Sequence, residues 1–141
     1  MVHSNCDATN CLEVRKSTIP NGGLGLFAKK KFAKGEKIIE YIGEYKNYDT
    51  QNDSSEVHKG HTYCFEYKLG HCIDAADELV SSIARFANDS HSSGKKNNAR
   101  FSVWFKNKDK THVFLKAKHT IKVGDEILVS YGKSYWNTRD L

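Results

Sequence analysis

The sequence contains little proline and no long apolar run, and each shortage excludes a class of protein. Pro20 is the single proline in 141 residues, which argues against a proline-rich linker or a disordered chain. No apolar run approaches the roughly 18 residues that a membrane-spanning helix needs. Residues 1–6 lack the charged-then-apolar pattern of a secretory signal, so we expect an intracellular protein.

Cysteine is also scarce, with Cys6, Cys11, Cys64 and Cys72 as the four examples. They are too few and too irregularly spaced to predict a disulfide framework in a chain without a signal peptide. They also lack the paired C-x2-C spacing of a structural zinc site. The sequence therefore predicts free, structural thiols and no bound metal.

Charge is distributed unevenly along a chain whose length suits one domain. The formal net charge is +5, yet residues 36–89 carry 11 acidic and 5 basic residues. The flanks hold the other 6 of 17 acidic and 17 of 22 basic residues. Such a layout suits a basic peptide against the acidic middle and nucleic acid against the basic flanks.

Apolar residues alternate with polar ones along most of the chain, which predicts short strands. Alternation in residues 101–106 and 111–118, around a polar turn at 107–110, predicts a hairpin. Further strands are expected at residues 63–68, 37–42 and 127–131.

One helix is expected at residues 77–87, because Asp77 suits its first position and Leu79, Ile83 and Phe86 share a face. Residues 48–60 and 89–98 are polar and predict loops. We expect a domain over residues 12–136 between an unordered tail at 1–11 and a short tail at 137–141.

Five short segments carry the candidate chemistry. They are Gly22 to Ala28 (GGLGLFA), Glu40 to Glu44 (EYIGE), Ile73 to Ala75 (IDA), Arg85 to Ser90 (RFANDS) followed by Asn97 to Arg100 (NNAR), and Gly124 to Gly132 (GDEILVSYG) trailed by Tyr135 and Trp136. The first segment does not meet the dinucleotide-binding pattern, because no long helix follows its glycines. Alone, each segment is an ordinary turn, strand or loop.

In order and spacing, these segments resemble the SET-domain protein-lysine methyltransferases. The likeness is greatest to minimal SET domains, as in small viral proteins, which lack flanking zinc-binding segments. The resemblance implies a mainly β fold of several small sheets with short helices. It also implies a C-terminal pseudoknot, a rare exception to un-knotted topology, that brings Asn88 to Tyr131.

The resemblance implies a site for S-adenosylmethionine, with S-adenosylhomocysteine as the product and no metal. Its predicted cofactor-binding residues are Gly23, Leu24, Gly25, Tyr63, Arg85, Asn88, Asp89 and Trp136. Glycines admit close approach of the backbone, and an asparagine amide can both donate and accept. Asp89 departs from the family, which has histidine there; its backbone can still meet the adenine, but its carboxylate cannot donate.

Tyr131 is the catalytic residue that the resemblance implies, and Glu126 is expected to be structural. Tyr41, Phe65, Phe101 and Val129 are predicted to line the channel for the lysine. Val129 and Phe101 occupy positions where family members that stop at one methyl group carry a hydroxyl. The product is therefore expected to extend to di- or trimethyl-lysine.

The implied substrate is a basic peptide, with histone tails as the leading candidates. A histone substrate implies a nuclear or chromatin location and contact of the basic flanks with nucleosomal DNA. Two other functions stay open: a SET-like module that binds peptide with weak catalysis, and a basic nucleic-acid-binding domain. The lysines at 29–31, 95–96 and 106–110 favour the latter, although lysines beside strands also serve solubility.

Overall fold

The computed structural model describes residues 8–47, 64–68, 71–107 and 110–132. Its backbone contacts divide into two compact units. Unit 1 comprises residues 1–39, 86–102 and 114–130, and unit 2 comprises residues 40–85, 103–113 and 131–141. Each unit is considered by itself below.

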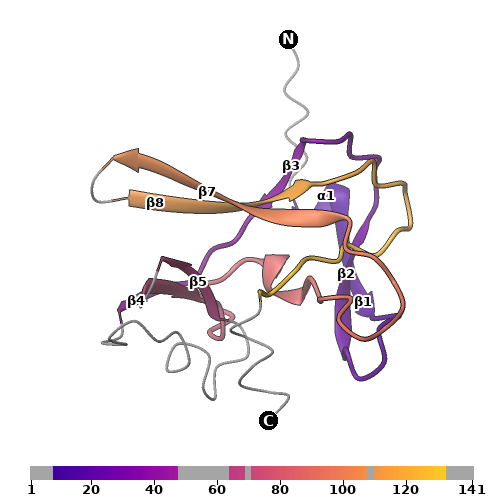
Figure 1. The fold of residues 1–141 in the computed structure, drawn as a ribbon, viewed down its shortest axis with the longest axis horizontal. Coiled ribbons are helices and arrows are strands. Elements are labelled where there is room, and N and C mark those ends of the chain that lie inside the picture. Colours follow the sequence, from indigo (N-terminus) through magenta and orange to yellow (C-terminus); the bar gives the residue numbers. More distant parts are fainter. Residues whose placement is uncertain (1–7, 48–63, 69–70, 108–109, 133–141) are drawn as a thin grey trace. The chain divides into compact units, whose positions relative to one another are not determined.

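The described residues form short strands with very little helix, as Figure 1 shows. In chain order the elements are α1 (Ala8–Cys11), β1 (Leu12–Lys16), β2 (Leu24–Ala28), β3 (Lys37–Glu40), β4 (Glu44–Asn47), β5 (Cys64–Lys68), β6 (His71–Asp74), the 3-10 helix η1 (Ile83–Phe86), β7 (Ala99–Asn107) and β8 (Lys110–Ala117). They make sheets of order β1-β2, β3-β8-β7 and β4-β6-β5. The predicted mainly β fold of small sheets is confirmed.

Strands β1 and β2 pair antiparallel from Leu12–Ala28 to Lys16–Leu24 in unit 1. The backbone N–H of Ser17 donates to the carbonyl of Gly23 (2.8 Å), which closes the loop between the strands. Gly23 has φ of 61°, a left-handed conformation that glycine adopts without strain. The sequence predicted only the turn, because the strand residues from Gly25 to Ala28 are all buried and do not alternate.

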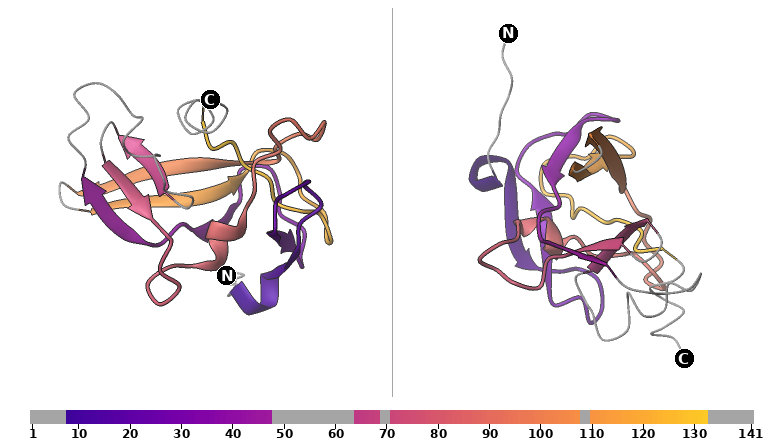
Figure 2. Two further views of the ribbon diagram at one scale, coloured as in Figure 1. Left: turned by 90° about the horizontal axis from the view of Figure 1, so that it is seen from below. Right: turned by 90° about the vertical axis from the view of Figure 1, so that its left-hand side faces the viewer.

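The predicted hairpin is confirmed, since β7 and β8 are neighbours in one sheet and form a long ribbon (Figure 2). The expected strands at 37–42 and 63–68 appear as β3 and β5. The expected strand at 127–131 is wrong, because no continuous strand forms there. Leu128 instead makes a single parallel bridge to Asn88, and Val129 makes one to Ala99. Two expected segments, the loop at 48–60 and the turn residues 108–109, lie outside the described residues.

The predicted helix at residues 77–87 is wrong, because only Ile83–Phe86 forms one 3-10 turn. Leu79, expected on its apolar face, is 93% exposed. The Asp77 carboxylate accepts from the backbone N–H of Leu79 (2.9 Å) and so closes a local turn. A side chain that bonds its own neighbouring backbone competes with helix formation.

In unit 2, β6 lies between β4 and β5 and pairs antiparallel with both. Its residues Cys72, Ile73 and Asp74 are buried. Gly43, just before β4, lies directly against the backbone of Asp74 and Ala75: a Cβ there would be 2.7 Å from the Asp74 carbonyl carbon. A side chain at position 43 therefore does not fit.

The prediction of free thiols is wrong for Cys11 and Cys72, each of which is disulfide-bonded. Both residues are buried, at 2% and 0% exposure. The prediction relied on spacing along the chain, which says nothing of which sulfur atoms the fold brings within bonding distance. No helix of the described residues is long and apolar enough to cross a membrane.

Candidate functional site

The Asn88 side chain holds the glycine turn of unit 1. Its Nδ2 atom donates to the carbonyl oxygens of Gly22 (3.2 Å) and Leu24 (3.0 Å). A Cβ on Gly22 would lie 3.1 Å from the same Nδ2 atom and 2.9 Å from Ser17 Oγ. Residues 22–24 and Asn88, which are 64 or more positions apart, therefore form one tightly fitted corner.

Glu126 fixes the other side of this turn. Its carboxylate accepts from Ser17 Oγ (2.6 Å), from the Thr18 backbone N–H (2.8 Å) and from Thr18 Oγ1 (2.5 Å). A Cβ on Gly25 would collide with Glu126 Oε2, so the carboxylate occupies the space that this glycine leaves. Glu126 is only 8% exposed.

The ionisation of Glu126 reflects two opposing effects. Burial raises the pKa of its carboxyl group, but hydrogen bonds from Ser17, Thr18 and Asn88 stabilise the anion, and the pKa is lowered overall. The residue is thus a charged anchor at neutral pH. Its contacts are all with the protein itself, in keeping with the structural role expected for it.

Residues 126–129 pass between two other segments of unit 1. On one side the Val129 N–H donates to the Asn88 carbonyl (2.8 Å). On the other side the Asn98 and Ala99 N–H groups both donate to the Leu128 carbonyl (3.0 Å each). The Asn98 side chain adds bonds from the Leu128 N–H (2.9 Å) and to the Glu126 carbonyl (2.9 Å). The C-terminal segment is therefore enclosed by the 88–99 connection, the crossing expected of the pseudoknot.

Asp89 is buried at 7% exposure, and its carboxylate organises the loop that follows it. Oδ1 accepts from the His91 backbone N–H (3.0 Å) and from Asn97 Nδ2 (3.3 Å). Asn97 in turn accepts from the Ser90 N–H (3.0 Å). An acceptor at position 89 is thus matched by local donors.

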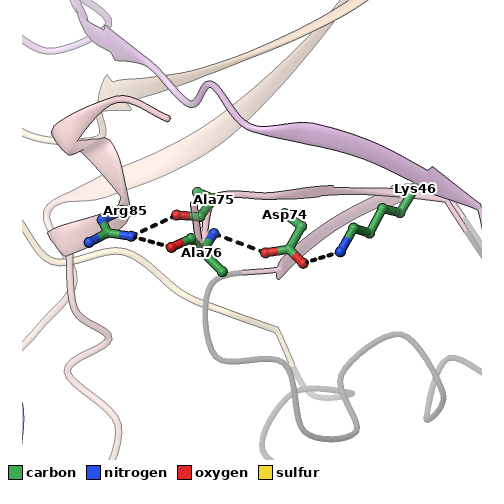
Figure 3. A network of polar contacts seen from close by, with 5 residues as sticks. All are labelled: Lys46, Asp74, Ala75, Ala76 and Arg85. Carbon is green, nitrogen blue, oxygen red and sulfur yellow. Dashed lines mark hydrogen bonds and ion pairs between the residues drawn. The ribbon is translucent and has the colours of Figure 1, made fainter. Parts of the chain in front are cut away.

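Arg85 belongs to a network in unit 2 that Figure 3 shows in close-up. Its Nη1 atom donates to the carbonyls of Ala75 and Ala76 (2.9 Å each), and Nη2 bonds Glu78 (2.9 Å). Asp74 extends the network by accepting from the Ala76 N–H (2.9 Å) and from Lys46 Nζ (2.8 Å). Arg85 therefore fixes the backbone after β6; its contact with a cofactor stays a prediction.

The predicted channel residues divide between the units. In unit 2 the rings of Tyr41 and Phe65 have centroids 6.3 Å apart and an interplanar angle of 59°. In unit 1 Val129 is fully buried and Phe101 half-buried. Their lining of one channel stays a prediction, as does the approach of half-buried Tyr131 to Asn88.

Tyr63 and Trp136, both predicted to contact the cofactor, lie outside the described residues. Two contributors to the site were missed from the sequence, Ser17 and Thr18, which donate to Glu126. Both precede the glycine turn. Their hydroxyl groups were the only available signal, and it is shared by ordinary loop residues.

The Asn88 corner offers a hydrogen-bond acceptor and open backbone side by side. The amide oxygen of Asn88 accepts no hydrogen bond from the residues that the structure describes, so it is available to an ammonium group. Gly23 beside it exposes its backbone, and a Cβ there would meet nothing within 4 Å. Among the described residues, no group of three or more His, Cys, Asp or Glu side chains is arranged to hold a metal ion.

Comparison with known proteins agrees with this architecture. The family described as "SET domain" matches residues 23–132. The chain is 27% identical to histone-lysine N-methyltransferase ash1 of Drosophila melanogaster, covering 97% of this chain and 7% of ash1. It is 28% identical to N-lysine methyltransferase KMT5A-A of Xenopus laevis, covering 84% of this chain and 36% of that protein. The chain thus spans a minor part of these relatives.

A solved structure gives the same result for the fold. The chain superimposes on ctPRC2 in an autoinhibited conformation bound to S-adenosylmethionine with a TM-score of 0.68 and 24% identity. The overlap covers 93% of this chain and 16% of the other. Within the described residues, the fold combines small sheets, a C-terminal segment hydrogen-bonded on both sides and a glycine turn held by an asparagine. The chain belongs to the SET-domain family.

Proposed function

We propose that the chain is a protein-lysine N-methyltransferase that takes its methyl group from S-adenosylmethionine. One observation carries the proposal: the Asn88 amide joins the Gly22–Leu24 turn, while the Asn88 carbonyl holds Val129. This arrangement supports binding of the amino-acid part of the cofactor, which carries a charged amine. The bound cofactor would lie beside the segment that leads to Tyr131. Relatives that carry lysine methyltransferase activity by name support the same reaction.

Covalent geometry supports a role for Tyr131 at this joint. The Val129 backbone N–H donates a hydrogen bond to the Asn88 carbonyl. Only Ser130 separates Val129 from Tyr131 in the sequence. Two residues of extended chain span at most about 7 Å. The Tyr131 backbone must therefore lie within about 7 Å of the Val129 backbone. Its hydroxyl is proposed to accept a hydrogen bond from the substrate amine and so aim the amine's lone pair.

The chain's own residues must also favour the neutral amine. About one free lysine in 2,500 is neutral at pH 7, and lowering its pKa from about 10.4 to 7 requires about 4.6 kcal/mol. The aromatic pair Tyr41 and Phe65 is proposed to wall the channel and desolvate the ammonium group, which lowers its pKa. When bound beside the Asn88 corner, S-adenosylmethionine would supply an electrophilic methyl group on a sulfonium, and the carbon–sulfur bond of that methyl group would break as the amine takes it, leaving S-adenosylhomocysteine. The surplus proton of the methylated amine would leave to water.

The proposed substrate is a basic protein, with a histone tail as the leading candidate and chromatin as the place of action. The name of ash1 supports this choice, as does the excess of acidic residues between positions 36 and 89. We propose products up to di- or trimethyl-lysine, because neither Val129 nor Phe101 carries a hydroxyl.

A transfer assay tests the proposal. The full chain is incubated with S-adenosylmethionine, radiolabelled in its methyl group, and with each core histone separately. We expect label on lysine of at least one histone, identified by mass spectrometry. Binding of S-adenosylhomocysteine with no label on any histone or basic peptide would favour a SET-like module that binds cofactor without catalysis. Absence of both binding and label would overturn the proposal.

A further inference from the structure

Two lysine-rich segments of unit 1 lie side by side, although they are far apart in the sequence (Figure 1). Phe32 and Ile121 exchange both backbone hydrogen bonds at 2.9 Å in an antiparallel bridge. Ala117 receives a bond from the Gly35 N–H (2.7 Å) and donates to the Glu36 carbonyl (2.9 Å). Residues 29–37 therefore run along residues 116–125.

This pairing gathers lysines from both segments into what we call the lysine strip. Its members are Lys29, Lys30, Lys31, Lys34, Lys37, Lys116, Lys118 and Lys122. The two segments hold only two carboxylates, Glu36 and Asp125. Glu36 is ion-paired with Lys30, and Asp125 accepts from the Lys122 backbone N–H (2.9 Å). Eight cations against two anions leave a strong positive excess.

The strip has a rigid base. Phe32, Ala117 and Ile121 are at most 2% exposed, and they anchor the backbone between the lysines. Two lysine heads lie over aromatic rings: Lys30 Nζ is 4.7 Å from the centre of the Phe32 ring, and Lys37 Nζ is 4.3 Å from that of Phe114. Six of the eight lysines are exposed, the exceptions being half-buried Lys30 and Lys116. Two of the charges are thus held at defined places, and most of the strip is exposed to a partner.

We infer that the lysine strip binds the phosphate backbone of double-stranded DNA. Lysines act as point charges toward phosphate and carry no sequence information. Base stacking needs exposed aromatic rings, but in the strip Phe32 is buried and Phe114 half-buried. The chemistry therefore fits duplex backbone without sequence preference. Such binding would require neither the cofactor nor a histone.

The test is fluorescence anisotropy with labelled duplexes of two unrelated sequences and the full chain, at several salt concentrations. A surface that contacts about five phosphates loses roughly 500-fold in affinity between 50 and 200 mM salt. We expect a loss of DNA affinity of that order over this salt range, and equal affinity for both duplex sequences. No binding at 50 mM salt, or binding to one sequence alone, would refute a backbone-binding strip.

A matched pair of variants locates the surface. Lys31 and Lys122 adjoin the Phe32–Ile121 bridge, so K31E/K122E places two negative charges in the strip. K96E/R100E changes the net charge by the same amount at exposed positions of unit 1 outside the strip. We expect K31E/K122E to weaken binding at least 10-fold and to lower the salt slope by about 2. The control should weaken binding less than 3-fold.

Two results would overturn the assignment. Equal losses of DNA affinity in both variants would mean that net charge alone attracts DNA and that the lysine strip has no specific role. Binding of phosphatidylserine vesicles that depends on Lys31 and Lys122, without binding of duplex DNA, would assign the strip to a membrane surface. Thermal unfolding of both variants confirms that each is folded before binding is measured.

Discussion

Glu126 shows how one side chain can determine the shape of the site. It lies 108 residues from Thr18 in sequence, yet it accepts bonds from both the backbone and the hydroxyl of that residue. Its carboxylate also occupies the space beside Gly25. A buried anion with several donors contributes to stability only while it is charged and all its donors are engaged.

We expect Glu126→Gln to lose about 1–3 kcal/mol of unfolding free energy at pH 7, since bonds to a charged acceptor are replaced by weaker ones. Because the pKa is lowered in the folded chain, the charge stabilises above the ordinary value of 4.5 and ceases to do so as pH falls through the folded pKa. The difference in unfolding free energy between the variant and the wild type should therefore become smaller in acid.

Urea denaturation at pH 7 and at pH 3 measures this effect. Glu13→Gln is the control, because the Glu13 side chain is 50% exposed and its ion pair with Arg15 is long at 4.0 Å. The control should change stability by no more than about 0.5 kcal/mol at either pH. A Glu126→Gln penalty that grows in acid would contradict the assignment of an ionised anchor.

Two elements of unit 2 meet where β6 ends. Arg85 follows the start of η1 and donates to two backbone carbonyls there. Arg85→Ala leaves both carbonyls without this donor, and we expect a loss of about 2–4 kcal/mol. Glu78→Gln, at a side chain 81% exposed, should cost about 0.5 kcal/mol or less. Unchanged stability with weaker S-adenosylhomocysteine binding would instead make Arg85 a direct ligand.

Gly43, just before β4, is also closely surrounded by backbone atoms. Gly43→Ala would set a Cβ against Asp74 and Ala75, whose main chain cannot rotate away, and we expect about 2–3 kcal/mol of destabilisation. Gly94→Ala is the comparison: its φ of 82° is strained for alanine, but its surroundings are open. That variant should cost about 1 kcal/mol by thermal denaturation. Equal costs would rule out steric exclusion at Gly43.

Local elements were the most predictable part of the fold. Strands β7 and β8 alternate over eight or nine residues and lie next to one another in sequence, so their pairing followed from pattern alone. Strand β2 was missed because Gly25 to Ala28 are buried in succession. The helix at 77–87 failed because Asp77 bonds the Leu79 backbone, a choice that the apolar spacing does not reveal.

At the scale of the whole molecule, the site could be inferred only through family resemblance. Asn88 was named from its motif, and the structure shows its bonds to residues 22 and 24. The donors to Glu126 could not be inferred, because they come from Ser17 and Thr18, more than 100 positions away. Sequence pattern reports local periodicity and carries little information on contacts of that range.

The number of methyl groups added depends on the proposed channel as a whole. Wild type should carry its substrate to di- or trimethyl-lysine, since Phe101 and Val129 offer no hydroxyl to restrain the amine. The substitution Phe101→Tyr adds a hydroxyl group to the channel and should shift the product toward monomethyl-lysine. Mass spectrometry at long reaction times measures the product. Only monomethyl-lysine from the wild type would refute this view of the channel.

Methyl transfer as proposed depends on Tyr131 aligning a lysine amine beside the Asn88 corner. Its most direct test is the single-turnover rate of methyl transfer by Tyr131→Phe and wild type, with S-adenosylhomocysteine affinity measured in parallel. We expect a rate at least 100-fold lower in the variant, a loss of about 2.7 kcal/mol in transition-state stabilisation, with S-adenosylhomocysteine affinity changed less than 3-fold. An undiminished rate in Tyr131→Phe would contradict this role of Tyr131.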